Sequence, residues 1–282
     1  AGGARGGGGG GGASGGGDGS GGGVGGAGGG AGGDDAPRNL KIFASDQSAR
    51  VDDFTRIWYC WEEGSGGSRV QSWRCSVSGG DTLLSGGTTL VAKEGRGPFW
   101  RDRQLLLADG LHAGMNTVAV KVEGVRADGS VTAAATASAR VWLPPAFLSP
   151  DPAHRGETMS KKGRAFPYSW KRRTFVLSMP VRTASGALEA RLAYFAGDPA
   201  DASLFKGEVL LRPRPADGGI DVEVARDAQH SLKVVAASPA RTLQLRAESA
   251  EAADQVAACL GQLAAMAKSE DVGGWLGLRP DL

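Results

Sequence analysis

The sequence predicts a mainly β protein with two folded units and one C-terminal α-helix. From residue 38 onward, short apolar or β-branched runs alternate with clusters of turn residues, and a single apolar stripe at helical spacing follows near the C-terminus. Composition adds a third observation, because 23 of the 47 glycines fall in residues 1–33. The remaining length is enough for two modest domains or one large one, with cores that require neither disulfides nor metals.

Residues 1–37 are expected to form a disordered, glycine-rich segment of low complexity. Glycine loses the most backbone entropy on ordering, and this stretch has almost nothing apolar to bury. Its glycine patterns do not indicate a phosphate-binding loop, because such a loop needs a strand before it and a helix after it. The chain begins with Ala1 rather than Met, so we expect a processed product or a fragment.

Residues 38–143 are predicted to form a β-sandwich of short strands. The last strand should end at Leu143, because the two prolines that follow cannot donate to a ladder. The predicted strands cover residues 40–43, 54–58, 70–73, 116–122 and 139–143, with turns at 64–67, 79–81, 86–87 and 128–129.

Residues 144–155 are predicted to be a proline-rich linker, and residues 156–268 a second compact unit that opens with strands. Residues 269–282 are expected to be a loose tail, although their apolar pair Trp275-Leu276 is able to dock.

The second unit should close with a helix from Ala250 to about residue 268. Val256, Leu260 and Leu263 form a stripe that can face a core. Ser249 is the expected N-cap, because its hydroxyl can accept from a backbone N–H of the first turn.

The charge of the chain is nearly balanced, with 32 basic and 30 acidic residues and a net charge of +2. This balance excludes a globally basic nucleic-acid binder, and no nucleic-acid partner is expected. A local excess is present between Arg155 and Phe175, where seven basic residues accompany the single acid Glu157. No run approaches the roughly 18 apolar residues that a membrane-spanning helix needs.

Side chains alternate between the two faces of a strand, so Lys171, Arg173, Phe175 and Leu177 should share one face of strand 170–177. The two apolar residues would point into a core, and the two cations would lie at its open mouth. Lys161 on the preceding strand can join them. Converging cations of this kind suit phosphate groups, because Lys offers a point charge and Arg a planar fork.

Several segments in this region resemble the pleckstrin homology (PH) domain family, in the order that the family shows. Residues 159–163 resemble its first strand and residues 170–177 its second, which is the most specific match. Residues 192–195, 206–210 and 243–249 resemble later strands of the family, and together the match covers residues 156–268.

The resemblance implies a bent seven-stranded β-sandwich or barrel capped by one C-terminal α-helix, with no enzymatic activity. Family members that bind phosphoinositides carry a lysine, a variable loop and then Lys/Arg-x-Arg. The resemblance therefore assigns headgroup binding to Lys161, Lys171 and Arg173. It adds Lys206, which precedes Gly207, and Arg164 in the variable loop.

This chain departs from the family pattern at three places. Val256 stands where the family commonly has a helix tryptophan, and Ala193 stands where some tight binders have a tyrosine. The loop 178–186 is also longer than usual in the family.

Residues 38–143 resemble immunoglobulin-like repeats of the polycystic-kidney-disease (PKD) type through residues 114–122, Asp128-Gly129 and the strand before Pro144-Pro145. Such repeats are usually extracellular, whereas a PH-like module acts on cytosolic lipid.

Cys60 and Cys75 are compatible with one disulfide in an oxidising compartment or with two reduced core thiols. Cys259 is expected to be a packed thiol on the helix stripe. We expect no metal site, because suitably spaced additional ligands are missing, and no nucleophilic catalysis around His112, His154 or His230.

The sequence therefore predicts a non-enzymatic adaptor without a cofactor, cytoplasmic and peripherally associated with phosphoinositide-containing membranes, with unidentified protein partners. One alternative is a PH-fold protein–protein interaction module that uses its exposed strands and the loop 166–168. A second is an extracellular adhesion fragment, which requires a Cys60–Cys75 disulfide.

Overall fold

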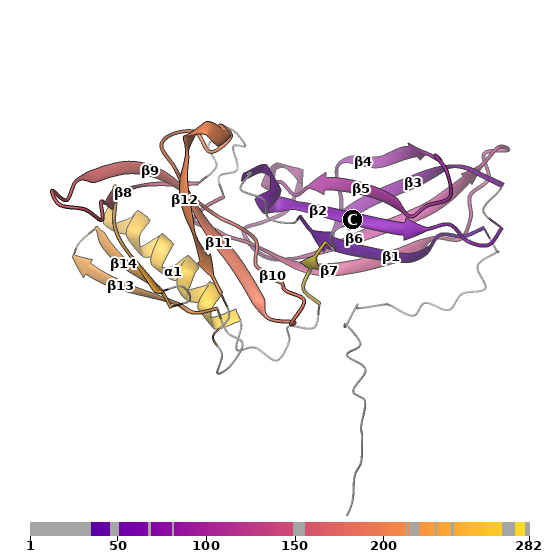
Figure 1. Ribbon diagram of the computed structural model, residues 1–282. Coiled ribbons are helices and arrows are strands. Elements are labelled where there is room, and N and C mark those ends of the chain that lie inside the picture. Colours follow the sequence, from indigo (N-terminus) through magenta and orange to yellow (C-terminus); the bar gives the residue numbers. More distant parts are fainter. Residues whose placement is uncertain are drawn as a thin grey trace, which may run out of the picture.

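A computed structural model describes residues 35–45, 51–66, 69–80, 82–148, 156–212, 214, 220–228, 230–237, 240–266 and 274–279. These residues confirm a mainly β fold capped by one C-terminal helix. Figure 1 shows two units side by side, the first in indigo to magenta and the second in rose-red, orange and yellow. The glycine-rich segment to residue 34 and the linker residues 149–155 lie outside the described residues. No described helix is long and apolar enough to cross a bilayer.

The first unit is a sandwich whose strands are β1 (Arg38–Ala44), β2 (Arg56–Glu62), β3 (Val70–Gly79), β4 (Thr82–Ala92), β5 (Phe99–Gln104), β6 (Gly114–Arg126) and β7 (Ala135–Leu143). One sheet has the order β4-β3-β6-β7, and the opposing sheet contains β1-β2-β5. Alternation along β3 from Trp73 to Val77 and along β6 from Asn116 to Gly124 buries every second residue, as expected for a sheet with one face in a core. The buried side chains include Trp61, Trp73, Val118, Val120 and Val122.

Two predictions for this unit are wrong. Residues 51–55 form a short 3-10 helix, η1, before β2 rather than the start of a strand. Gly86-Gly87 lies inside β4 and not in a turn. The sequence reading also missed β4 and β5, because glycines and charged residues interrupt their apolar alternation.

The second unit contains β8 (Glu157–Lys162), β9 (Trp170–Leu177), β10 (Val181–Arg182), β11 (Leu188–Phe195), β12 (Phe205–Leu211), β13 (Val222–Ala228), β14 (Ser231–Ala237), β15 (Ala240–Ala247) and the helix α1 (Ala250–Met266). Its strand order is β13-β14-β15-β8-β9-β11, with β12 paired to the other edge of β11. The strands curl around a core that α1 covers, as Figure 1 shows.

Helix α1 confirms the sequence prediction in its start and its buried face. Val256, Cys259, Leu260 and Leu263 are buried against the strands. The Ser249 hydroxyl accepts a hydrogen bond of 3.0 Å from the Ala252 backbone N–H, which satisfies one of the unpaired donors of the first turn.

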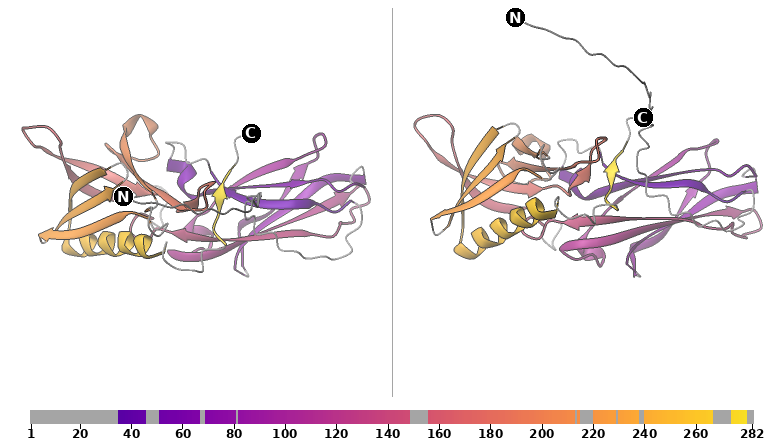
Figure 2. Two further views of the ribbon diagram at one scale, coloured as in Figure 1. Left: turned by 60° about the horizontal axis from the view of Figure 1, so that its bottom comes forward. Right: turned by 90° about the horizontal axis from the view of Figure 1, so that it is seen from below.

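The expectation of a loose tail is wrong for residues 274–279. Strand β16 (Gly277–Leu278) pairs in parallel with both β1 and β10 and thereby joins the sheets of the two units into one 12-stranded sheet. Both views in Figure 2 place this yellow strand between the units. Trp275 is buried in the core of the second unit and Leu276 in that of the first. The tail is ordered because its two neighbouring apolar side chains each find a core to enter.

Other side chains cross between the units in the same manner. Phe147, from the predicted linker, is buried in the core of the second unit. Met179 and Val181, in the long loop that holds β10, are buried in the core of the first. Phe54 of η1 packs against the outer face of the second unit, beside Phe195. The two units therefore share buried surface as well as a sheet.

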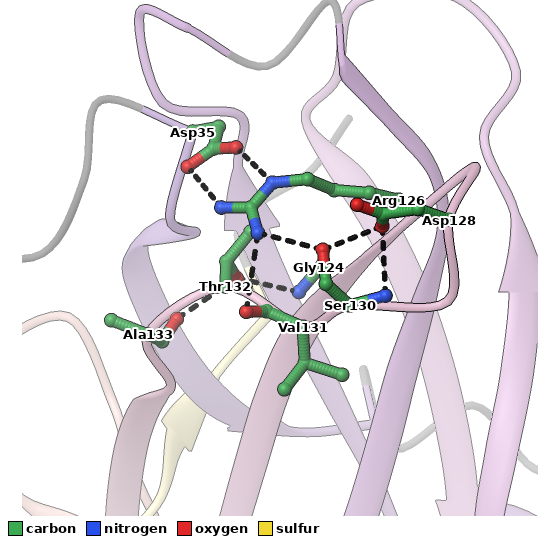
Figure 3. A network of polar contacts seen from close by, with 8 residues as sticks. All are labelled: Asp35, Gly124, Arg126, Asp128, Ser130, Val131, Thr132 and Ala133. Carbon is green, nitrogen blue, oxygen red and sulfur yellow. Dashed lines mark hydrogen bonds and ion pairs between the residues drawn. The ribbon is translucent and has the colours of Figure 1, made fainter.

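At the opposite end of the first unit, Asp35 and Arg126 form a bidentate ion pair (Figure 3). The Arg126 Nε and Nη2 atoms donate to the carboxylate over 2.7 and 3.0 Å. Another guanidinium nitrogen donates to the Ser130 hydroxyl, and Ser130 in turn is held by Asp128. This network fastens residue 35 to the turn between β6 and β7, and the hydrogen bonds from Arg126 hold the pKa of Asp35 below its ordinary value.

Replacing Trp275 with Ala should lower the free energy of unfolding by about 3–5 kcal/mol, because a buried ring is deleted and a cavity remains. Urea denaturation measures the change. Leu90→Ala is the control, because Leu90 is exposed and its truncation should cost less than about 0.5 kcal/mol. Equal effects of the two variants would contradict the docking of the tail.

The Asp35–Arg126 pair predicts a pH dependence of stability. Because the folded-state pKa of Asp35 is lowered, its contribution is fully present above the unfolded value of about 4 and is lost as the pH falls through the folded value. Asp35→Asn should therefore destabilise the protein at pH 7, and the difference from the parent should shrink in acid. Thermal unfolding between pH 7 and 3 measures this. Glu223→Gln, at an exposed strand position, is the control, and a difference that persists unchanged at pH 3 would contradict the prediction.

Candidate functional site

The strongest concentration of charge lies on the interior face of the β8–β9 hairpin. Lys161 is directly opposite Lys171, and Arg173 is opposite Met159. Met159 and Phe175 are buried in the core of the second unit. The register therefore confirms that the three cations share the core-facing side and lie nearer the loop, and we refer to Lys161, Lys171, Arg173 and their surroundings as the basic cup.

Lys161 is the least solvated cation of the basic cup. Its ammonium lies 5.0 Å from the centroid of the Tyr194 ring. Burial is the main cause that lowers its pKa, and repulsion from Arg241, Arg164 and Arg173 acts in the same direction. The charged form of Lys161 is thus disfavoured, and an anion in the cup would relieve that cost.

Arg241 on β15 is a cup residue that the sequence reading missed. Its Nη2 atom donates to the Tyr194 hydroxyl over 2.7 Å, and another guanidinium nitrogen donates to the Glu208 backbone carbonyl. Arg241, Leu243 and Leu245 occupy every second position of β15, and the two leucines are buried. The strand pattern of the sequence therefore allowed the prediction that Arg241 also points inward.

The structure shows which of two neighbouring residues on β11 faces the basic cup. Tyr194, and not residue 193, is paired with Phe175 and faces the interior. Ala193 is paired with Val176 and packs on the opposite face with Phe54 of the first unit. The sequence alone gave no register for this strand relative to β9, so the two neighbouring positions were not distinguishable.

No ion pair among the described residues joins the five predicted site residues Lys161, Arg164, Lys171, Arg173 and Lys206 to a carboxylate. Arg172 behaves differently because it points to the other face of β9, where it lies 2.6 Å from Glu248. Arg173 donates instead to the Arg172 backbone carbonyl over 2.8 Å. Within the part of the chain that the structure describes, the positive charge of the cup therefore has no carboxylate partner.

The five predicted residues are not equally close together. Lys161, Lys171 and Arg173 share the cup, and Arg164 in the exposed loop is near enough to affect Lys161. Lys206 is exposed at a bulge at the start of β12, and no described hydrogen bond or ring contact joins it to the other four.

Exposed aromatic side chains lie beside the cup, in the loop 163–169 and at the start of β9. Phe166 is 86% exposed, and its ring meets the Tyr168 ring edge to face at 6.1 Å. Lys162 lies 4.9 Å from the Tyr168 ring, and Arg246 lies 4.5 Å from the Trp170 ring. In Figures 1 and 2 the β8–β9 hairpin extends away from the first unit.

The cysteines are all free thiols. On β2, the buried residues Tyr59 and Trp61 face the core, so Cys60 between them points to the outer face. Cys75 is buried on the inner face of the opposing sheet. A disulfide between Cys60 and Cys75 would require one strand to reverse its faces. Cys259 is packed in the core as predicted.

Two other features of the described residues are weaker candidates for a functional site than the basic cup. A cavity of about 640 Å³ lies in the first unit, away from the basic cup, and its lining mixes Glu62, Glu63, Lys93 and Arg96. Lys93 and Glu63 neutralise each other there. The described residues contain no group of three or more His, Cys, Asp or Glu side chains placed to hold a metal ion.

Comparison of the chain with protein-family profiles, with curated protein sequences and with solved structures gave no match in any of the three.

Gly207 is needed where β12 passes Tyr194. It has φ +137°, and a Cβ there would lie 2.7 Å from the Tyr194 hydroxyl. Gly207→Ala should lower the free energy of unfolding by about 1–3 kcal/mol through backbone strain and displacement of Tyr194. Gly261→Ala is the matched control, because Gly261 is in α1 with open space around it, and alanine should stabilise the helix by up to about 1 kcal/mol. Chemical denaturation measures both variants, and effects of the same sign would contradict this role of Gly207.

Proposed function

We propose that residues 156–268 form a PH-like module that binds the phosphorylated headgroup of a phosphoinositide in the basic cup. The observation that supports this most directly is the group of inward cations that no carboxylate among the described residues neutralises. The protein would act without enzymatic activity, as an adaptor at the cytoplasmic face of a membrane. No cofactor is required.

Each cup residue has a distinct task in this proposal. Lys161 and Lys171, directly opposite each other, would approach a phosphate from two sides as point charges. Arg173 would supply the planar fork that suits two phosphate oxygens. Arg241 would hold the Tyr194 hydroxyl in place at the inner wall of the cup. Arg164 would add charge from the loop, and Lys206 would act as an outlying contact.

The loop beside the cup suits contact with a bilayer surface. Cations near an anionic leaflet contribute about 1 kcal/mol each, and aromatic rings favour the interface between water and hydrocarbon. Phe166 and Tyr168 are exposed next to such cations. Because the hairpin extends away from the first unit, the first sandwich remains available as a spacer or as a surface for protein partners.

The alternative function is a protein–protein interaction module that ignores lipid. The exposed rings of Phe166 and Tyr168 favour it, because aromatic residues are enriched in the centres of protein interfaces. The extracellular adhesion alternative is weakened, since it requires a Cys60–Cys75 disulfide and the two side chains point to different faces.

The test is sedimentation with liposomes of phosphatidylcholine, with and without a phosphoinositide. Lys171→Ala/Arg173→Ala should reduce the phosphoinositide-dependent partition coefficient by about 30-fold, the equivalent of two cations at about 1 kcal/mol each. Binding by the parent should also weaken as salt is raised. Arg74→Ala/Lys233→Ala removes the same charge from strands outside the cup and should bind as the parent does.

Equal binding by the cup variant and the parent would refute the proposal. Absence of pelleting with every lipid, together with a stable partner that Phe166→Ala/Tyr168→Ala fails to capture, would instead support the protein-binding alternative.

A further inference from the structure

A second region of unbalanced charge lies inside the first sandwich. A cavity of about 220 Å³ opens between its two sheets, at the side where the edge strands β4 and β5 leave the sandwich unsealed. Residues from both sheets line it, among them Tyr59, Cys75 and Thr89 and, on β5, Arg101, Asp102 and Arg103. The proposed function above uses none of these residues.

A large bulge in β4 lies at this cavity. The register passes from Ser76 opposite Thr88 to Ser78 opposite Leu83, so residues 84–87 stand against the single residue Val77. Bulges bend a strand away from its partner and are frequent beside functional sites. Gly87 in this bulge and Val77 opposite it both line the cavity.

Arg101 points into the sandwich. It is directly opposite Tyr59 on the neighbouring strand, and Tyr59 is buried in the core, so the two side chains share the inner face. An arginine on the inner face of a sandwich costs free energy unless an anion accompanies it.

The neighbouring arginine has such an anion. Arg103, also on the inner face, donates to the buried Asp109 carboxylate over 3.0 Å. Arg101 forms no ion pair among the described residues. Asp102 alternates to the other face of β5, where its carboxylate lies 3.6 Å from Arg56.

Three residues that line the cavity with Arg101 are neutral: Tyr59, Cys75 and Thr89. Burial raises the pKa of Tyr59 well above its ordinary value and raises the pKa of Cys75 to about 12, so both remain protonated at neutral pH. Thr89 is opposite Cys75 and adds a hydroxyl. A guanidinium without an ion pair among the described residues, beside hydroxyl and thiol groups, is an arrangement that suits an oxyanion.

We propose that this cavity binds a small oxyanion, a carboxylate or a phosphate, through Arg101, with Tyr59, Cys75 and Thr89 as neutral donors. At about 30 Å³ per water molecule, the cavity has room for roughly seven waters, or for an anionic group with a few carbon atoms attached. The site is independent of the basic cup, which is open and carries several cations.

The experiment is isothermal titration of the full chain with inorganic phosphate, with acetate and with neutral acetamide, repeated as thermal-shift measurements. The Lys171→Ala/Arg173→Ala variant is used as the background, so that phosphate bound in the basic cup does not contribute. Phosphate or acetate should bind and raise the unfolding temperature, and acetamide should not.

Arg101→Met should weaken binding by about 10- to 100-fold, because a charged hydrogen-bonding group is removed. Arg74→Met, on the outer face of β3, is the matched control and should bind as the background does. Tyr59→Phe keeps the ring and removes one donor, so a smaller loss is expected and the proposal stays testable if Arg101→Met does not fold.

Binding of acetate alone, of phosphate alone or of both supports the site and identifies the anion. No binding of either up to about 10 mM, or equal binding by Arg101→Met and Arg74→Met, would overturn it. Neither the titration nor the thermal-shift measurement contains lipid. A failure of the anion site would therefore leave the liposome result unaffected, and a failure of phosphoinositide binding would leave the anion site unaffected.

Discussion

The strict alternation of side chains along β9 is the constraint on which the basic cup depends. Phe175 must be buried to complete the core of the second unit, and this places Arg173 and Lys171 on the same side. A slip of one residue would bring Arg172 inward and remove Phe175 from the core of the second unit. The packing of the core therefore holds the cations in a direction that their own repulsion opposes.

The same rule acts in the first unit, with a different result. Burial of Phe99 and the pairing of Tyr59 with Arg101 bring the Arg101 guanidinium between the sheets, beside that of Arg103. Arg101 lines a cavity with the neutral residues Tyr59, Cys75 and Thr89, whereas the cup gathers several cations on one face. One cation without an ion pair among the described residues suits one small anionic group, and a cluster of cations suits a ligand with several phosphates.

Much of the second unit followed from local patterns. The span of β9, the start of α1 and its buried stripe were predicted, because each depends on residues close together in sequence. Arg241 and Tyr194 were not assigned, because their places depend on strands that pair far along the chain. The sequence predicts a turn at Gly86-Gly87, whereas these residues lie in the bulged strand β4. The two structures are hard to distinguish because glycine is favoured both in turns and in β-bulges. The docking of Trp275 was undecidable from the sequence, because its pocket is assembled from both units.

Strand β16 has a consequence for how the protein is made. Residues 274–279 are synthesised after every other described element, yet they supply the strand that lies between β1 and β10. Until they arrive, those two strands present unsatisfied backbone donors and acceptors, which are templates for pairing with other chains. The nascent protein is thus exposed to aggregation until residues 274–279 have left the ribosome, and their insertion between β1 and β10 ends that vulnerable interval.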